Sequence, residues 1–261
     1  MLPRKFQRGW ISAAITALLV CVIGVPAHSA KAEDGSGLEA GVHKALDNKK
    51  FHDVSISVND GIVVLTGTVE RYADKEDADR RAHRVHGVKG VDNKIEAGGS
   101  ASISDEALRD KLAKGLAYDR VGYGTAAFNS INIGVRDGVV TLSGTVYGPP
   151  DKSSALGLVE NTAGVRDVID NLEVAPLSPM DDELRLRLAR AIYGDSTLQK
   201  YALDPAKPIR ITVVNGNVML TGVVDNKMDR DVAGLRANGV SGAFKVVNEL
   251  QLAGAGPEKA K

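Results

Sequence analysis

The sequence predicts an α+β fold of three tandem small αββαβ modules, each a three-stranded sheet packed against two helices. Three observations predict it: a ten-residue pattern occurs three times, its spacing to the next strand is constant, and apolar residues follow helix and strand periods. The pattern starts at residues 60, 137 and 215, and its second glycine always precedes a valine by 24 residues. We expect module 1 at residues 36–97, module 2 at 103–175 and module 3 at 180–253.

Each repeat begins with an aliphatic residue at every fourth position, which is the period of one helix face. These stripes are Leu38, Val42 and Leu46, then Leu108, Leu112 and Leu116, then Leu184, Leu188 and Ile192. Ser36 and Glu39 have the spacing of a capping box, and Asp105 and Asp181 are candidate N-caps of the other two helices.

Two strands and a tight turn follow. Residues 54–58, 131–135 and 209–213 alternate apolar and polar side chains, which is the period of a half-buried strand. Asp-Gly or Asn-Gly then supplies the positive φ angles of a hairpin turn. A second glycine stands six residues after the first, and we assign both to turns and packing rather than to a phosphate-binding loop. The structural glycines are Gly61, Gly67, Gly138, Gly144, Gly216 and Gly222.

The rest of each repeat predicts a second helix and a third strand. Small residues at helical spacing let this helix approach the sheet closely, and a glycine ends it. The third strands are expected at residues 91–95, 168–172 and 246–250, reached by a right-handed crossover. One polar position recurs in this strand and is assigned a structural role: Asn93, Asp170 and Asn248.

Residues 1–32 are typical of a secretory signal peptide. Basic residues precede an uncharged run at 10–25, and small residues up to Ala32 fit a cleavage site. The run is shorter than the ~20 residues that a membrane-spanning helix needs. We therefore expect export to the periplasm, with no stable transmembrane segment after cleavage.

Composition narrows the function classes. The net charge is zero and only 4% of residues are aromatic, which argues against a nucleic-acid partner. The one cysteine, Cys21, excludes a disulfide framework or a cysteine-rich zinc site. No catalytic motif is present, so we expect no enzyme and no cofactor.

The repeated pattern D/N-G-x-V-x-L-x-G, followed by a helix ending in Gly-Val and then V-x-N/D-x-L, resembles the BON domain. This family is named for bacterial osmotically inducible and nodulation proteins. Ala243 departs from the usual valine in module 3, and Asp170 from asparagine in module 2. The resemblance implies an exported envelope protein of a diderm bacterium, an αββαβ fold, contacts with phospholipid or envelope partners, and no catalysis.

Two residue groups are candidate binding sites. His83 and His86 stand one helical turn apart, a spacing that suits a metal, but no third ligand is fixed and we expect no metal site. In module 3, Leu186 should lie opposite the core face of the first helix, surrounded by Arg185, Arg187 and Arg190. An exposed leucine among arginines suits an anionic bilayer surface. The alternative is that Leu186 packs against module 2 and that the arginines pair with the acidic residues at 181–183.

The sequence thus predicts a non-enzymatic periplasmic protein that contacts anionic phospholipid or an envelope protein and supports membrane integrity or the osmotic-stress response. The alternative is a protein-interaction adaptor or chaperone without direct lipid binding, which would use grooves between modules and the aromatic loops around Tyr123, Phe128 and Tyr201. A third hypothesis is a metal-responsive module. The sequence does not specify the lipid, the partner, the oligomeric state or the inducing stress.

Overall fold

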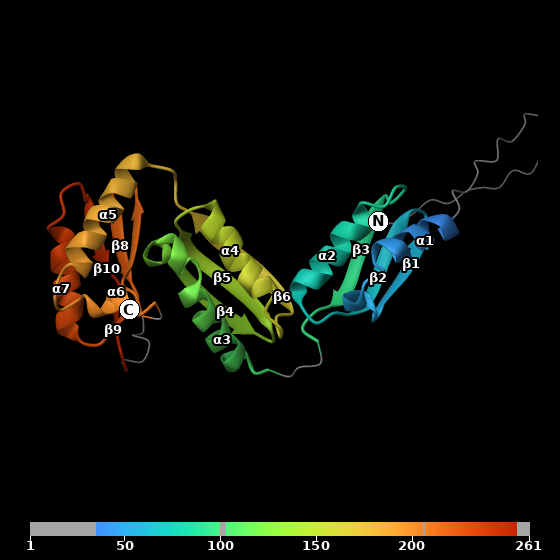
Figure 1. Ribbon diagram of the computed structural model, residues 1–261, viewed down its shortest axis with the longest axis horizontal. Helices are drawn as coiled ribbons and strands as arrows, with labels where there is room; N and C mark the ends of the chain where they lie inside the picture. Colours follow the sequence, from blue (N-terminus) through green and yellow to red (C-terminus); the bar gives the residue numbers. More distant parts are fainter. Residues whose placement is uncertain (1–34, 100–102, 206, 255–261) are drawn as a thin grey trace, which may run out of the picture. The chain divides into compact units, whose positions relative to one another are not determined.

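A computed structural model describes residues 35–99, 103–205 and 207–254 (Figure 1). The predicted signal peptide lies outside the described residues. Each of the three repeats forms a three-stranded mixed sheet with its own helices, to which module 3 adds a two-stranded sheet, so the predicted α+β fold of tandem modules is confirmed. No helix in the described ranges is both long enough and apolar enough to cross a bilayer.

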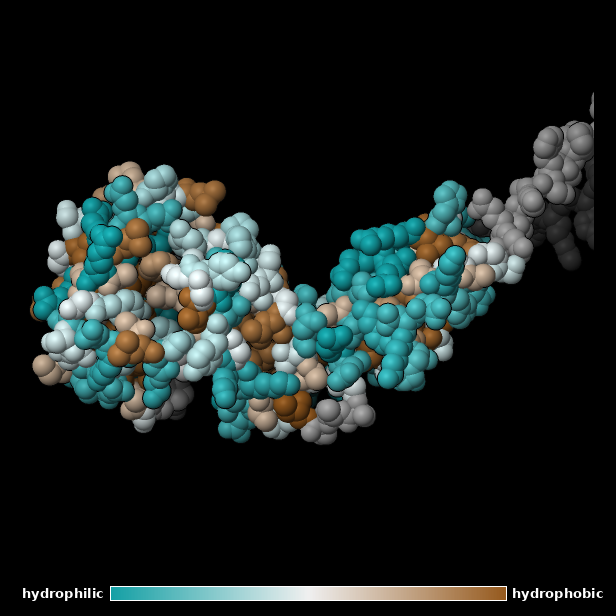
Figure 2. All heavy atoms as spheres, viewed as in Figure 1, coloured by the Kyte–Doolittle hydropathy of each residue, from teal (hydrophilic) through white to brown (hydrophobic). Residues whose placement is uncertain are grey.

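Module 1 has the predicted order of elements with one added 3-10 turn. They are α1 (Gly35–Ala45), η1 (Lys49–Phe51), β1 (Val54–Asn59), β2 (Ile62–Thr68), α2 (Tyr72–His83) and β3 (Gly90–Glu96). β1 pairs with β2 antiparallel, and β2 pairs with β3 in parallel, as a crossover through α2 requires. The surface over α2 is almost wholly hydrophilic in Figure 2, in keeping with its many charged residues.

Module 2 repeats this topology with the strand order β4-β5-β6. Its elements are α3 (Asp105–Tyr118), η2 (Val121–Tyr123), η3 (Ala126–Phe128), β4 (Ser130–Arg136), β5 (Val139–Val146), α4 (Pro149–Glu160) and β6 (Asp167–Val174). The two 3-10 turns occupy the longer loop between the first helix and the first strand, so this loop is ordered by local structure.

Module 3 differs in its strands. Its elements are α5 (Pro179–Tyr193), α6 (Lys200–Leu203), β7 (Arg210–Val214), β8 (Asn217–Thr221), β9 (Val223–Val224), α7 (Lys227–Asn238), β10 (Lys245–Asn248) and β11 (Gln251–Leu252). The second strand is interrupted at Gly222 and the last one after Asn248, so two short sheets replace one continuous sheet.

Each module has its own apolar core, formed between the helices and one face of the sheet. The predicted helix stripes supply it: Leu108, Leu112, Leu184, Leu188 and Ile192 are all fully buried. Phe128 from the module 2 loop packs against the core of module 3, so modules 2 and 3 share apolar contacts that the repeats alone did not predict.

The predicted N-caps are wrong. Ser36 lies inside α1, and the side chains of Ser104 and Ser178 cap α3 and α5. Asp181 instead accepts hydrogen bonds from the backbone N–H groups of the hairpin turn, at 2.8 Å from Asn215 and 2.8 Å from Gly216. Asp105 does the same for the turn in module 2. Asp105 is the first residue of α3 and Asp181 the third residue of α5, so each carboxylate reaches the turn from the first turn of its helix.

The turn prediction is confirmed. All six structural glycines have positive φ, and the Asp or Asn before each turn glycine does too. The second glycine of each repeat has a further reason, because a Cβ atom at Gly144 would lie 2.1 Å from the carbonyl oxygen of Ser130. The strand can pass its neighbour at this point only without a side chain.

The recurring polar residue of the last strand has the structural role expected. The Asn93 amide donates to the carbonyl of Lys75 at 3.0 Å, and Asn248 donates to that of Arg230 at 2.8 Å. In module 2 the residue is Asp170, and the ammonium group of Lys152 takes over by pairing with Asp170 at 2.8 Å.

Candidate functional site

Helix α5 carries the predicted lipid contact, and the structure separates its four residues. Arg185 is only 2% exposed, whereas Leu186 is 50% exposed and Arg187 and Arg190 also face solvent. The prediction that Arg185 surrounds an exposed leucine is therefore wrong, because its side chain turns toward the sheet. Lipid contact by Leu186, Arg187 and Arg190 stays a prediction.

Arg185 serves as an internal link between elements. Its guanidinium donates to the carboxylate of Asp182 and to the backbone carbonyl of Val213. It also lies over the ring of Tyr147 from module 2, with 5.2 Å between the guanidinium carbon and the ring centroid. Hydrogen bonds to both charged and neutral acceptors, together with the aromatic ring, replace the water that this cation loses on burial.

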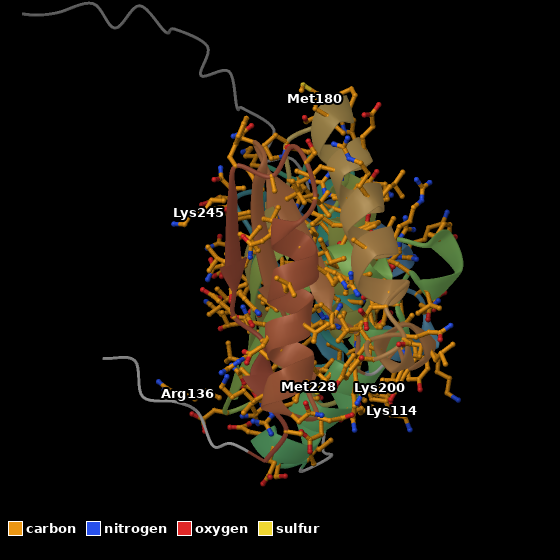
Figure 3. All side chains as sticks on the ribbon, turned by 90° about the vertical axis from the view of Figure 1, so that its left-hand side faces the viewer. Lys114, Arg136, Met180, Lys200, Met228 and Lys245 are labelled. Carbon is orange, nitrogen blue, oxygen red and sulfur yellow. The ribbon has the colours of Figure 1, made fainter. Side chains whose placement is uncertain are left out.

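One end of module 3 combines apolar and basic side chains that face solvent. The Asp181 contacts hold the start of α5 against the Asn215-Gly216 turn, and the Phe244 N–H donates to the Gly216 carbonyl at 2.9 Å. We call this end the module 3 tip and define it by Leu177, Met180, Arg187, Phe244 and Lys245. Met180 and Lys245 lie toward this end in Figure 3, whereas Met228 and Lys200 lie toward the opposite end.

Phe244 is the most unusual residue of the tip. Its ring packs over Gly216, yet 84% of the residue is exposed. At the equivalent position, modules 1 and 2 place the side chains of Lys89 and Arg166 over their turn glycines. A solvated cation is ordinary there, whereas an exposed phenylalanine leaves a large apolar surface in water.

Comparison with known proteins agrees with the repeat pattern. A family model of the BON domain matches residues 34–99, 104–176 and 195–254. The chain belongs to the BON domain family. The third match begins after α5, so the helix that carries Arg185 and the start of the tip lies outside the matched residues.

Two relatives and one solved structure are similar to this BON protein. "Osmotically-inducible protein Y" of Escherichia coli (strain K12) is 32% identical over 150 residues, which is 54% of this chain and 72% of the relative. An "Uncharacterized protein in gshII 5'region" of Anaplasma centrale is 27% identical over 122 residues, 46% of this chain and 80% of that protein. The C-terminal domain of CdsD, a structural protein of the type III secretion system of Chlamydia trachomatis, shares 18% identity at a TM-score of 0.23. The structural likeness covers 83% of this chain and 97% of the CdsD domain.

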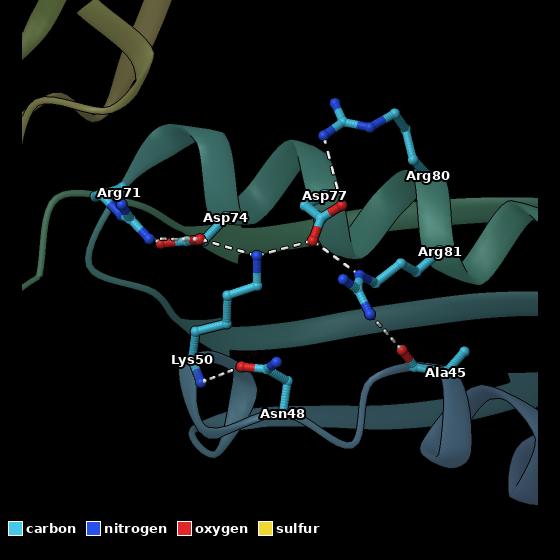
Figure 4. Close-up of polar contacts among 8 residues, drawn as sticks. All are labelled: Ala45, Asn48, Lys50, Arg71, Asp74, Asp77, Arg80 and Arg81. Carbon is cyan, nitrogen blue, oxygen red and sulfur yellow. Dashed lines mark hydrogen bonds and ion pairs between the residues drawn. The ribbon is translucent and has the colours of Figure 1, made fainter. Parts of the chain in front are cut away.

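Each BON module also contains a buried aspartate that the sequence analysis missed. Asp74, Asp151 and Asp229 stand seven residues after the second glycine and are at most 3% exposed. In module 1, the Lys50 ammonium lies between Asp74 at 3.2 Å and Asp77 at 2.8 Å, while Arg71 pairs with Asp74 at 2.9 Å (Figure 4). This network ties the loop before β1 to the start of α2. The constant spacing was the signal that could have revealed it.

The other two BON modules use different partners for the same carboxylate. Asp151 accepts hydrogen bonds from Thr125 and Asn129 and pairs with Arg120 at 3.3 Å. Apart from Arg71, which precedes α2 in module 1, these partners come from the loop between the first helix and the first strand. The buried carboxylate therefore fixes a loop whose length and sequence vary among the modules.

The aspartate in module 3 gives a pH dependence. Burial by itself would raise the pKa of Asp229, but hydrogen bonds from Lys200 and Tyr201 outweigh it and hold the pKa below its usual value. Its contribution to stability is therefore present above the unfolded-state pKa of about 3.9 and is lost as pH falls through the lower folded-state pKa. We expect Asp229→Asn to destabilise module 3 at pH 7, with the difference from wild type shrinking below about pH 4.

Urea denaturation at pH 7 and pH 3 measures this difference. Glu249→Gln, at an exposed carboxylate of the same module, is the control and should give no comparable change with pH. A wild-type advantage over Asp229→Asn that is equally large at pH 3 would contradict the assignment.

The aromatic loops and the histidines fit the alternative hypotheses poorly. Tyr201 is buried and Phe128 packs into module 3, so of these three aromatic residues only Tyr123 is exposed. His83 lies 3.1 Å from the carboxylate of Asp79. Within the described residues, no group of three histidine, cysteine or acidic side chains could hold a metal ion.

Proposed function

We propose that this chain is a non-enzymatic periplasmic envelope protein that contacts phospholipid through the module 3 tip and supports membrane integrity or the osmotic-stress response. BON family membership and the relation to osmotically-inducible protein Y support an envelope-associated role. The observation that carries the lipid contact is Phe244, an exposed phenylalanine where modules 1 and 2 have Lys89 and Arg166.

The chemistry of the tip suits a bilayer interface. Phe244 and Met180 are 84% and 81% exposed, and burying each fully in an apolar medium would contribute about 1.5–3 kcal/mol. Arg187 and Lys245 add about 1 kcal/mol each near an anionic surface. Because Arg185 is buried, electrostatic attraction supplies the smaller part of the binding free energy. We therefore expect weak membrane binding that added salt reduces only partly.

Flotation with vesicles of phosphatidylglycerol or phosphatidylcholine tests the proposal. We expect wild-type protein to float with the anionic vesicles, and the double variant Met180→Ser/Phe244→Ser to lose most of this binding. Both residues are solvent-exposed, so the variant should keep its thermal midpoint.

The matched control is Met228→Ser/Leu203→Ser. These residues are 65% and 78% exposed in the same module, but Met228 lies toward the opposite end (Figure 3), and Leu203 adjoins Lys200, which lies there too. The control should float like wild type. Equal loss in both variants would indicate general hydrophobic adhesion, and no flotation of wild type would favour the adaptor or chaperone hypothesis.

A further inference from the structure

A polar groove of about 510 Å³ lies away from the module 3 tip, where strands β4 and β5 of module 2 face the outer side of the module 3 sheet. A hydrogen bond between the hydroxyls of Ser130 and Thr221, 2.9 Å apart, joins its two walls. Thr145, Asn132 and Gln251 add further polar side chains. The lining therefore offers several hydroxyl and amide groups and no aromatic ring.

Arg210 lines this groove as a cation without a carboxylate partner among the described residues. Its Nη1 atom donates to the backbone carbonyls of Ala126 at 3.0 Å and Asn129 at 2.8 Å. Burial lowers the pKa of Arg210, because desolvation penalises its charged form. A guanidinium has five N–H donors, and those on Nε and Nη2 have no hydrogen-bond acceptor in the described part of the chain.

Thr212 gives a second, independent indication of a ligand. It is 7% exposed, lines the same groove, and its hydroxyl has no hydrogen-bond partner among the residues that the structure describes. A buried polar group without a partner is destabilising and is uncommon in native proteins. The positions of Arg210 and Thr212 are occupied by Ser55 and Ser57 in module 1 and by Asn132 and Gly134 in module 2. The pair is thus specific to module 3.

We propose that this groove binds the phosphate group of a small polar ligand, held by the free N–H donors of Arg210 and by the hydroxyl of Thr212. The planar guanidinium matches two phosphate oxygens, and the surrounding hydroxyls can serve the remaining ones. A carboxylate ligand would leave donors of this lining unpaired, because it has fewer acceptor oxygens than the lining has donors. Glu249 also lines the groove and would repel a second anionic group, which favours a ligand with a single phosphate.

NMR titration of the purified protein with inorganic phosphate and with sn-glycerol 3-phosphate tests this site. We expect saturable shifts at Thr212, Thr221 and Ser130. Thr212→Val, which keeps the side-chain shape, should weaken binding about fivefold or more while leaving the thermal midpoint unchanged or higher, since it removes an unpaired hydroxyl. Arg210→Gln should abolish binding, and Arg187→Gln, at an exposed arginine of the same module, should not alter it.

The outcomes separate the sources of the phosphate. If phosphatidylglycerol vesicles displace sn-glycerol 3-phosphate, and Thr212→Val weakens that displacement, the ligand is a lipid headgroup; if they do not, it is a soluble phosphate ester. No saturable shift, unchanged affinity in Thr212→Val, or equal binding of acetate would overturn the proposal. The tip variant Met180→Ser/Phe244→Ser should leave the titration intact, so the groove and the proposed lipid contact can fail separately.

Discussion

Arg185→Glu should lower the free energy of unfolding of module 3 by about 3–5 kcal/mol, whereas Arg187→Glu, two residues further along, should change it by less than about 0.5 kcal/mol. The first change places a carboxylate against the Val213 carbonyl and beside the carboxylate of Asp182, where a buried guanidinium had satisfied both. The second changes a side chain that already faces water.

Hydrogen exchange of the peptides that cover α5 and β7 measures this difference within the intact chain. Arg187→Glu is the control, because it makes the same change of charge on the same helix. Similar protection of α5 and β7 in wild type and in Arg185→Glu would show that the contacts of Arg185 contribute little to stability.

This prediction also affects how membrane binding should be tested. A triple change of Arg185, Arg187 and Arg190 to glutamate would abolish flotation by damaging module 3, whether or not those arginines touch lipid. Changing only Arg187 and Arg190 keeps the fold and tests the contribution of these two exposed arginines alone. The tip variants then test the apolar contribution.

Gly144→Ala should destabilise module 2 by about 2–5 kcal/mol. Gly144 has a φ of 115°, a conformation that costs about 1–3 kcal/mol for a residue with a side chain. The added Cβ would also lie 2.1 Å from the carbonyl oxygen of Ser130, so β4 and β5 would have to separate, which adds the penalty of overpacking.

Gly134→Ala, on the neighbouring strand β4, is the matched control. Its Cβ would meet no atom closer than 3.8 Å, so we expect a change of less than about 0.5 kcal/mol. Urea denaturation, monitored by hydrogen exchange of the module 2 amides, gives the change in the free energy of unfolding for each substitution. Equal effects of the two substitutions would contradict a steric role for the second glycine of the repeat.

Helix and strand positions could be predicted because they depend on local periods. The stripe Leu184, Leu188 and Ile192 and the alternation in β7 place one face of each element in the core regardless of the neighbouring module. Turn glycines are equally local, since Asp-Gly and Asn-Gly adopt the backbone angles that a tight hairpin needs. The continuity of the strands was less predictable: Gly67, Gly144 and Gly222 share one position of the repeat, yet only the module 3 strand is interrupted there.

The candidate site was only partly predictable, because a helical period tells which residues lie opposite the core but not what packs there. Arg185 occupies a position that looks exposed in an isolated module, yet the Tyr147 ring and the Val213 carbonyl enclose it. Phe244 could have been found by aligning it with Lys89 and Arg166, because only the third repeat replaces a cation at this position.

The sequence by itself determined that this protein consists of three αββαβ modules of the BON family, because repeated spacing and period depend only on the order of residues. Tertiary structure alone decided which polar groups lose water. It buried Arg185 and Asp229 with partners and placed Phe244 in solvent. Within the described ranges, it also left the Thr212 hydroxyl, beside Arg210, without a hydrogen-bond partner. The physical reason is that solvation depends on contacts between residues far apart in the chain, which no local pattern encodes.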